Sequence, residues 1–458
     1  MPRSLVRCVT KFSLCVLIGS THYRSNIVAE IDIRMDVSFM KSRICFLLSG
    51  TAISAVCLAP VGVTQDGTDW FDRSSVQPVS EQTDPATDPV PIANGGIDLS
   101  PEVLFSTGLD SNVLATDLNE IDDSYVGFTP SITMNSNWKR HALDGYFGVE
   151  HVQYSDLTDE RHTDLTVKLR GRLDLGEKTS VSLEVNGEDE TEDRTELSNV
   201  PLSTEPNEFS RIGGALGFSH QAGRFITTAS LAVNSYDHDD VEIAGGLIQD
   251  QDFRDHDELT GSARIAYAVN RNVALYTSVD HTEADFRPPN IFNAFNRDYS
   301  GTVLLVGTDF DLNDAISGDI GLGYQNYTYD DVSFEDIGDF AFDGHIDWQV
   351  ANATTVSAAA ARRVIDPGLI STNAAIETGA SLRLEQGVTR KFSLNGEAGF
   401  SQYEFELIDR DDDRLNLKLG GNWKLNQNIW LEGGYQISDQ TSDFQAFTDN
   451  RVVLKMRV

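Results

Sequence analysis

The stretch Asp164–Gly187, DLTVKLRGRLDLGEKTSVSLEVNG, alternates apolar and polar residues in two runs. In the first run Leu165, Val167 and Leu169 are separated by hydroxyl-bearing or basic residues, and the pattern restarts after a short polar break. Alternation with a period of two predicts two β-strands joined by a tight turn. Each predicted strand therefore has one apolar face and one charged face.

The same alternation recurs as far as Val458. From Gly95 onward we count about 18 such segments and find no convincing amphipathic helix. The segments recur about every 20 residues, which is longer than the spacing of about 8–12 residues in a soluble β-sandwich.

Charge and hydropathy decide what the two faces contact. The chain has 458 residues and a net charge of -36, and its mean hydropathy is -0.27. Beyond the N-terminal region it has no apolar stretch long enough for a transmembrane helix. A dry core cannot hold a charged face in strand after strand, because each unpaired buried charge is costly. The water-filled lumen of a membrane barrel can hold such a charged face. We therefore predict an all-β, transmembrane, antiparallel up-and-down β-barrel of about 18 strands.

The connections between the predicted strands alternate in length. Asn270–Asn272 and Leu425–Asn428 are short, whereas Glu188–Glu208 and Ser235–Glu258 are long and acidic. Bacterial outer-membrane barrels have short periplasmic turns and longer external loops. We therefore expect both ends of the barrel chain in the periplasm. The external carboxylates are either simply solvated or able to bind divalent cations or repel anions.

Three regions are expected along the chain. Residues 1–63 are interpreted as a signal region whose true start is Met40, because MKSRICFLLSGTAISAVCLAP has a basic start, an apolar run and small residues. Residues 64–94 are rich in Pro, Ser and Asp and are expected to form a flexible acidic periplasmic tail. Residues 95–458 form the predicted barrel. All four cysteines precede Val61, which excludes a disulfide framework from the barrel.

The aromatic residues assign the two faces. Tyr267, Tyr324 and Trp423 share the positions of the aliphatic residues, as expected for lipid-facing aromatic girdles. The alternate positions then face the lumen. The residues predicted to line it are Lys168, Arg170, Arg172, Glu184, Arg211, Arg264, Asp309, Asp319, Asp347, Glu377, Arg383, Glu397, Lys418, Glu432 and Lys455, and the same alternation adds Asp280, Asp343, Lys424 and Arg457. Such mixed charges either select solutes or merely cross-link the wall.

One long connection carries an unusual apolar content. Thr282–Asp298, TEADFRPPNIFNAFNRD, holds three phenylalanines and two prolines, which a solvated loop would not favour. It is the candidate constriction loop, folded into the lumen or packed against a neighbouring subunit. Its candidate residues are Phe286, Arg287, Phe292, Phe295 and Arg297.

Motifs of catalysis and of metal or cofactor binding are not evident. The sequence has no glycine-rich phosphate loop, paired-histidine metal motif or nucleophile elbow. The run Asp409–Arg414, DRDDDR, lacks the central glycine and terminal glutamate of a calcium loop. We therefore expect no enzyme activity, no cofactor, no metal site and no nucleic-acid partner.

Two stretches resemble a known family. STGLDSNV, at residues 106–113, resembles the signature that follows the first strand in the putative β-barrel porin 2 family. GYQISDQTSDFQAFTDNRVVLKMRV, at residues 434–458, is similar to the last hairpin of that family, although it ends in Val458 where such barrels usually end in an aromatic residue. The resemblance implies an outer-membrane barrel, in several lineages associated with exopolysaccharide export.

These observations predict a protein of the bacterial outer membrane that forms a water-filled channel for hydrophilic solutes, with polysaccharide export as one use. The alternative is a non-conducting structural or adhesive barrel whose acidic external loops bind cations, lipopolysaccharide or a partner. The expected partners are outer-membrane lipids and lipopolysaccharide, the outer-membrane assembly machinery through the last strand, and polysaccharide or small hydrophilic solutes.

Overall fold

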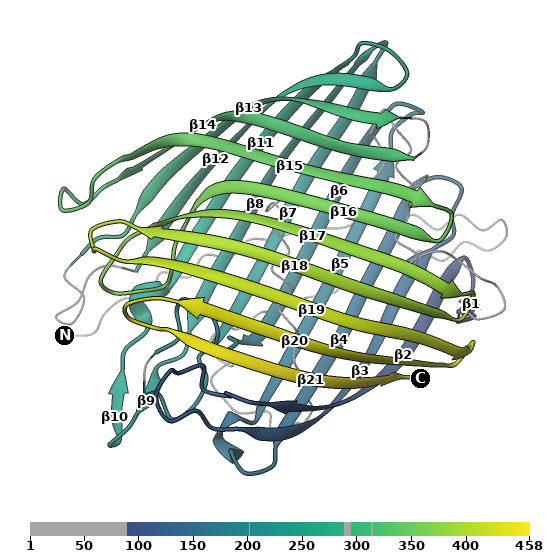
Figure 1. Cartoon of the computed structure of the whole chain (residues 1–458). Helices are drawn as coiled ribbons and strands as arrows, with labels where there is room; N and C mark the ends of the chain where they lie inside the picture. The colour runs from purple at the N-terminus through teal and green to yellow at the C-terminus, as the bar shows by residue number, and fades with distance from the viewer. Residues whose placement is uncertain (1–88, 201, 288–294, 313–314) are drawn as a thin grey trace, which may run out of the picture. The chain divides into compact units, whose positions relative to one another are not determined.

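The structure, a computed structural model, describes residues 89–200, 202–287, 295–312 and 315–458. In these residues a 19-stranded antiparallel sheet closes on itself where β2 (Ile97–Asp110) pairs with β21 (Phe447–Arg457). Of the strands in this sheet, only the short β1 (Ile92–Asn94) lies outside the ring of 18 (Figure 1). The predicted all-β barrel of about 18 strands is confirmed. The predicted signal region and residues 64–88 of the predicted tail lie outside the described residues.

The 18 strands of the ring differ little in length. They are β2 (Ile97–Asp110), β3 (Asp123–Ser136), β4 (Ala142–Tyr154), β5 (His162–Asp174), β6 (Thr179–Thr191), β7 (Glu208–Ala222), β8 (Phe225–His238), β11 (His256–Ala268), β12 (Val273–Phe286), β13 (Tyr299–Leu312), β14 (Ile316–Tyr329), β15 (Ile337–Ala351), β16 (Thr354–Ile365), β17 (Ala375–Thr389), β18 (Phe392–Phe405), β19 (Asp411–Asn426), β20 (Ile429–Thr441) and β21 (Phe447–Arg457). A separate hairpin of β9 (Val241–Ile243) and β10 (Leu247–Gln249) belongs to the connection between β8 and β11.

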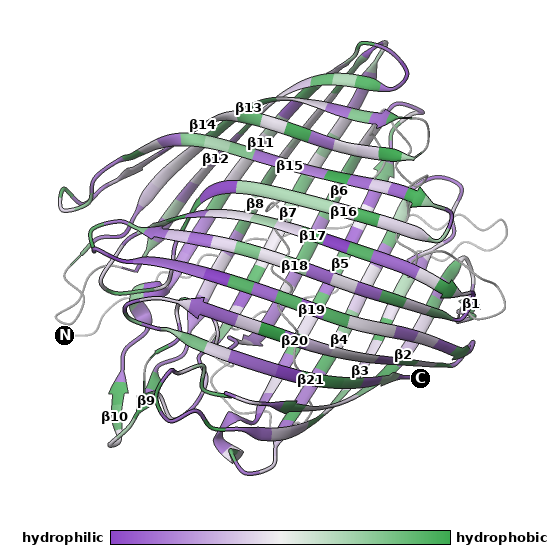
Figure 2. Ribbon diagram, in the orientation of Figure 1, coloured by the Kyte–Doolittle hydropathy of each residue, from purple (hydrophilic) through white to green (hydrophobic). Residues whose placement is uncertain are grey.

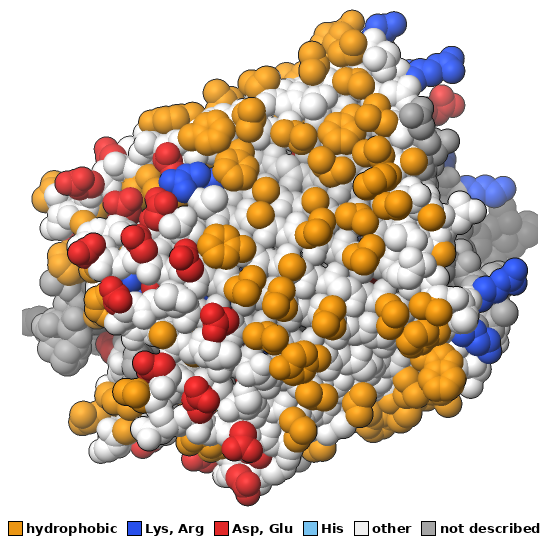
Figure 3. Space-filling model, viewed as in Figure 1, with side chains coloured by type: hydrophobic (Ala, Val, Ile, Leu, Met, Phe, Trp, Pro, Cys, Tyr) orange, Lys and Arg blue, Asp and Glu red, His pale blue; other side chains and the backbone are white. Residues whose placement is uncertain are grey.

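The stretch Asp164–Gly187 forms most of β5, most of β6 and the turn between them. Leu169 lies opposite Val185, and Arg170 lies opposite Glu184. Successive side chains of a strand point to opposite faces, so the aliphatic pair and the charged pair lie on different sides of the wall. Leu169 is 41% exposed although it is apolar. Figure 3 shows a broad band of such apolar side chains around the visible outer wall, and Figure 2 shows the underlying alternation along the strands.

Acidic and basic residues gather at opposite ends of this band. In Figure 3 acidic side chains cluster at the end of the long connections and basic ones at the end of the short turns. We call these the loop end and the turn end. Since outer-membrane barrels have short periplasmic turns, we expect the turn end to face the periplasm.

Several strands continue beyond the expected boundaries at the loop end. β6 runs to Thr191 and includes Glu188, Asp189 and Glu190, which were expected in the connection. Ladder hydrogen bonds join backbone groups and do not depend on side-chain polarity. The alternating pattern therefore marks the part of each strand that contacts lipid, whereas the paired strand extends further. The connection between β6 and β7 is consequently residues 192–207.

Buried apolar side chains gather at the loop end. One cluster contains Val113, Tyr125, Val152 and Tyr154, and two others contain the loop-side ends of β15 to β18. Helical structure among the described residues is confined to two single turns, η3 (Thr158–Glu160) and η4 (Asp252–Arg254). No helix in this part of the chain is long and apolar enough to cross a membrane.

The seam of the barrel is staggered at the turn end. β21 pairs with β2 from Leu104 to Asp110, and Val458 adds two backbone hydrogen bonds to Val103. β1 (Ile92–Asn94) folds back onto the first residues of β2 and covers part of the edge that β21 leaves open. The turn uses Gly95 and Gly96, both with positive φ, which suits a two-residue hairpin. The expected boundary between tail and barrel, at residue 95, falls in this turn.

Candidate functional site

The face opposite the apolar band carries paired charges. Lys168 Nζ lies 2.8 Å from a carboxylate oxygen of Glu188, which also binds Arg211. Arg264 pairs with Asp309 from β13. Because these pairs join neighbouring or nearby strands, they cross-link the inner wall of the barrel.

The structure places all fifteen residues predicted to line the lumen at strand positions that alternate with exposed apolar residues. Arg172, Arg383, Glu377, Lys418 and Glu397 make ion pairs, and Asp347 accepts a hydrogen bond from Ser357. Three others have charged residues opposite them in the register: Arg170 lies across from Glu184, Asp319 from Asp309, and Glu432 from Lys455. Whether these side chains line a conducting path remains a prediction.

Tyr276, which the alternation of apolar residues does not assign to the lipid face, also belongs to the inner wall. The ring of Tyr276 lies where a side chain on Gly307 or Gly321 would stand, so the two glycines make room for it. The guanidinium carbon of Arg264 lies 3.5 Å from the centre of this ring. Glycines on neighbouring strands, at the alternate positions, were the signal that could have revealed this packing.

The connection of residues 192–207, which we call the crossing segment, reaches the opposite wall. It leaves β6 and enters β7, and β18 lies nine strands from β7 in either direction around the ring. Leu197 is nevertheless only 6% exposed and packs against Ala375, Tyr403 and Phe405, at the loop-side ends of β17 and β18. The crossing segment must therefore span the mouth of the barrel at the loop end.

Buried ion pairs anchor the crossing segment on its own side. Arg194 forms a two-pronged pair with Glu160 of η3, with nitrogen–oxygen distances of 3.0 and 2.6 Å. Glu192 pairs with Arg254 of η4 and also accepts hydrogen bonds from Ser198 and Asn207. A bidentate pair of this kind fixes direction as well as distance.

Further anchors come from the far wall. Arg451 of β21 binds Asp193 of the crossing segment, Asp110 of β2 and Asp449 of its own strand, at 2.6, 3.0 and 2.6 Å. Arg414 of β19 donates a hydrogen bond to the carbonyl oxygen of Thr195. The contacts that Arg451 and Arg414 make with the crossing segment join residues more than two hundred positions apart, so no local sequence pattern predicts them.

Two carboxyl groups of the crossing segment have shifted pKa values. Burial alone would raise the pKa of Asp193, but the Arg451 guanidinium and hydrogen bonds from Thr195 hold it well below its usual range. Burial raises the pKa of Glu196 to about 7, against the opposing effect of Arg414. Asp193 and Glu192 add to that rise. The segment thus contains one firmly ionised group and one that titrates near neutrality.

The described residues of the candidate constriction loop contact other connections at the loop end. Phe286 is the buried last residue of β12, and Arg297 is buried, with bonds to Asp366 at 2.5 Å and to the Leu369 and Thr372 carbonyls. Arg287 pairs with Asp237 and Asp255, and Phe295 is 42% exposed with its ring 5.6 Å from that of Phe334. Phe292 lies outside the described residues. A role of this loop as a constriction remains a prediction.

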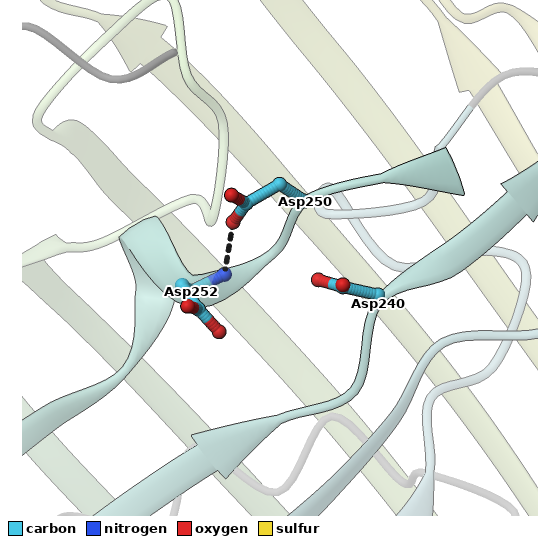
Figure 4. Close-up of side chains that lie close together, drawn as sticks. All are labelled: Asp240, Asp250 and Asp252. Carbon is cyan, nitrogen blue, oxygen red and sulfur yellow. Dashed lines mark hydrogen bonds between the residues drawn. The ribbon is translucent and has the colours of Figure 1, made fainter. Parts of the chain in front are cut away.

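Three aspartates converge beside the β9–β10 hairpin. Oxygens of Asp240, Asp250 and Asp252 lie within 4.8 Å of one another, and the Asp252 backbone N–H donates to Asp250 (Figure 4). Burial and the neighbouring carboxylates of Asp250 and Asp255 raise the pKa of Asp252. Asp240 and Asp252 are exposed, so the cluster presents negative charge to the solvent at the loop end.

An apolar outer wall, a charged inner wall and a mouth crossed by a folded connection define a porin-type barrel of the outer membrane. Solved barrels are similar in fold. OccK2 (OpdF) of Pseudomonas aeruginosa is 10% identical, with a TM-score of 0.45 over 79% of this chain and 97% of that one. A BenF-like porin of Pseudomonas fluorescens Pf-5 is 11% identical, with a TM-score of 0.44 over 80% and 99% of the two chains. The siderophore receptor PirA of Acinetobacter baumannii is 7% identical, with a TM-score of 0.44 over 79% and 80%.

Sequence comparison identifies the family. The model of the family described as "Putative beta-barrel porin 2" matches residues 84–458. The chain therefore belongs to this family, as the resemblance of residues 106–113 and 434–458 indicated. It is a porin-like channel protein of the bacterial outer membrane. No curated protein matches the sequence.

Proposed function

We propose that the barrel is a water-filled channel for hydrophilic solutes and that the crossing segment sets its narrowest width. The observation that carries the proposal is the contact of Leu197 with the wall nine strands away, above an inner wall of paired charges. A charged wall favours water in the lumen, because unpaired charges are costly in a dry interior. The crossing segment then limits the size of solute that can pass.

Conductance of the purified protein in planar bilayers tests this proposal. Wild-type protein should give stable ion-conducting steps. Replacing residues 193–206 by a short Gly-Ser linker should enlarge each step, because the connection could no longer reach the far wall. Replacing the exposed residues Asp443 and Phe444, in the connection between β20 and β21, by Gly and Ser is the control and should leave the step size unchanged, because these residues belong to another connection of the same end.

The same measurement compares the two candidate constrictions. Removing residues 288–297 should enlarge the current steps less than removing the crossing segment does. If this second deletion has the larger effect, the candidate constriction loop, and not the crossing segment, sets the narrowest width of the channel. Silence of wild type and both deletions would favour the alternative, a non-conducting barrel.

Polysaccharide is a narrower proposal for the cargo, and it rests on family resemblance. Swelling of liposomes that contain the protein, in neutral sugars of increasing length, would test it. Entry of oligosaccharides at a rate comparable with monosaccharides supports polysaccharide export, and a sharp cut-off at one or two sugar units contradicts it.

The alternative function has its own supporting observation, the cluster of Asp240, Asp250 and Asp252. Three convergent carboxylates at the loop end suit a divalent cation that bridges to lipopolysaccharide. Calcium titration of the wild type and of a variant with all three changed to Asn would distinguish bound calcium from simple solvation. The last strand, β21, is in turn the proposed contact for the outer-membrane assembly machinery.

A further inference from the structure

A cavity of about 870 Å³ lies against the wall at the turn end. It extends over the turn-side ends of β17 to β21 and β2. Its size lies within the range of roughly 300–1,000 Å³ that is usual for small-molecule sites. The cavity is far from the crossing segment and takes no part in closing the outer mouth.

Basic side chains dominate the lining of this cavity. Six basic residues and one acidic residue contribute to it: Arg383, Arg390, Lys391, Lys424, Lys455, Arg457 and Glu432. Two of the basic residues have acidic partners just outside the lining, since Arg383 pairs with Glu385 and Arg457 with Glu102. The lining itself therefore carries six cations and one carboxylate. This excess of positive charge stands in a chain whose net charge is -36.

An indole ring holds two of these cations together. The Lys424 ammonium lies 4.5 Å and the Arg457 guanidinium carbon 5.2 Å from the centre of the Trp430 ring. Cation–π attraction at such distances offsets part of the repulsion between the two cations. Trp430 therefore keeps two positive groups close to each other, one of which, Arg457, also pairs with Glu102.

We propose that this cavity binds solutes that carry carboxylate or other oxyanion groups. Guanidinium and ammonium groups are strong partners for oxyanions, and Arg can bind a carboxylate through two parallel hydrogen bonds. Asn395, Asn422 and Ser393 add uncharged hydrogen-bonding groups to the lining. The inference rests on the proposed channel, because it names the class of solute that the channel receives at its periplasmic side.

Calorimetric titration of the detergent-solubilised protein with citrate tests the site without relying on conductance. Wild type should bind citrate, and the uncharged probe sucrose should bind at least tenfold more weakly. The double variant Lys424→Gln, Arg457→Gln should lose at least tenfold in citrate affinity. Arg271→Gln removes one positive charge from an exposed turn outside the cavity and should have no effect.

A variant that binds citrate more tightly than wild type would show that the changes in affinity do not come from misfolding. Glu432→Gln removes the one carboxylate of the lining and should tighten citrate binding severalfold, which misfolding cannot imitate. The proposal is overturned if wild type does not bind citrate, or if the double variant binds as tightly as Arg271→Gln.

Bilayer conductance then separates this inference from the channel itself. Steps of current without citrate binding would overturn the anion site and leave the channel standing. Citrate binding by a protein that never conducts would support the site and contradict the channel.

Discussion

Leu169 and Arg170 are neighbours in β5 whose side chains contact different media. Leu169 lies on the exposed apolar face, and Arg170 lies opposite Glu184 on the other face. A Leu169→Arg change would place a charge against acyl chains, at a cost of about 2–4 kcal/mol near the bilayer centre. We expect this variant to assemble poorly, measured as the fraction of protein in the folded, heat-modifiable form on gels.

Arg170→Leu is the matched exchange on the adjacent position. It removes a charge from the inner wall and adds no charge to the lipid face, so assembly should stay close to that of wild type. Equal assembly of the two variants would show that the assignment of faces in β5 is wrong.

Arg451 holds together three carboxylates from three parts of the chain. Changing it to Met would leave Asp110, Asp193 and Asp449 near one another without their shared cation. Removing one partner of a buried ion pair typically costs about 3–5 kcal/mol. We expect the unfolding temperature of the Arg451→Met barrel to fall clearly below that of wild type in a thermal scan in detergent.

Arg271→Met provides the comparison, because Arg271 lies on an exposed turn. Its unfolding temperature should match that of wild type. If the unfolding temperature of Arg451→Met equals that of Arg271→Met, the three carboxylates must find other partners or become protonated at little cost.

Among the connections, the crossing segment contains a group whose charge changes near neutrality. The pKa of Glu196 is raised to about 7 from an ordinary value of 4.5. The packed segment binds the proton more tightly than a released one, so its stability is greatest below pH 4.5 and falls as the pH rises to about 7. Above about pH 7, Glu196 is ionised beside Asp193 and Glu192, and the Arg414 guanidinium offsets part of the repulsion.

We therefore expect channel conductance, or its fluctuation, to increase between about pH 5 and pH 7. Glu196→Gln should remove most of this dependence and keep the low-pH behaviour. Glu177→Gln changes an exposed carboxyl on a turn and should keep the wild-type profile. A profile that survives Glu196→Gln would assign the titration to another group.

The elements show which parts of the structure a sequence can predict. The β5–β6 hairpin can be predicted from the alternation of Leu165 to Leu169 and Val181 to Val185, because the polarity of each side chain matches the medium that it contacts. The ends of strands do not follow, because β6 continues through Glu188 to Thr191 by backbone pairing alone. The acidic composition of the crossing segment indicates solvation, cation binding or anion repulsion. It does not predict the buried contact of Leu197 with Tyr403, which depends on closure of the whole ring.

For the whole molecule, closure of the barrel predicts how the protein migrates in an SDS gel. Every strand of the described ring is paired with a neighbour on both sides, and an edge is left open only at the staggered turn end of β2, so unfolding a strand must break two ladders. We expect unboiled protein to resist SDS and to migrate apart from the boiled form. Identical migration before and after boiling, with protein known to be membrane-inserted, would contradict the closed barrel.

The stagger at the seam also has a practical consequence for labelling. Ile92 and Val458 both lie at the turn end, whereas the β9–β10 hairpin projects from the loop end with Gly245 and Gly246 at its tip (Figure 1). An epitope appended after Val458 should be hidden from antibodies on intact cells. The same epitope inserted between Gly245 and Gly246 should be displayed to them, so this tip would serve as a carrier position for foreign peptides.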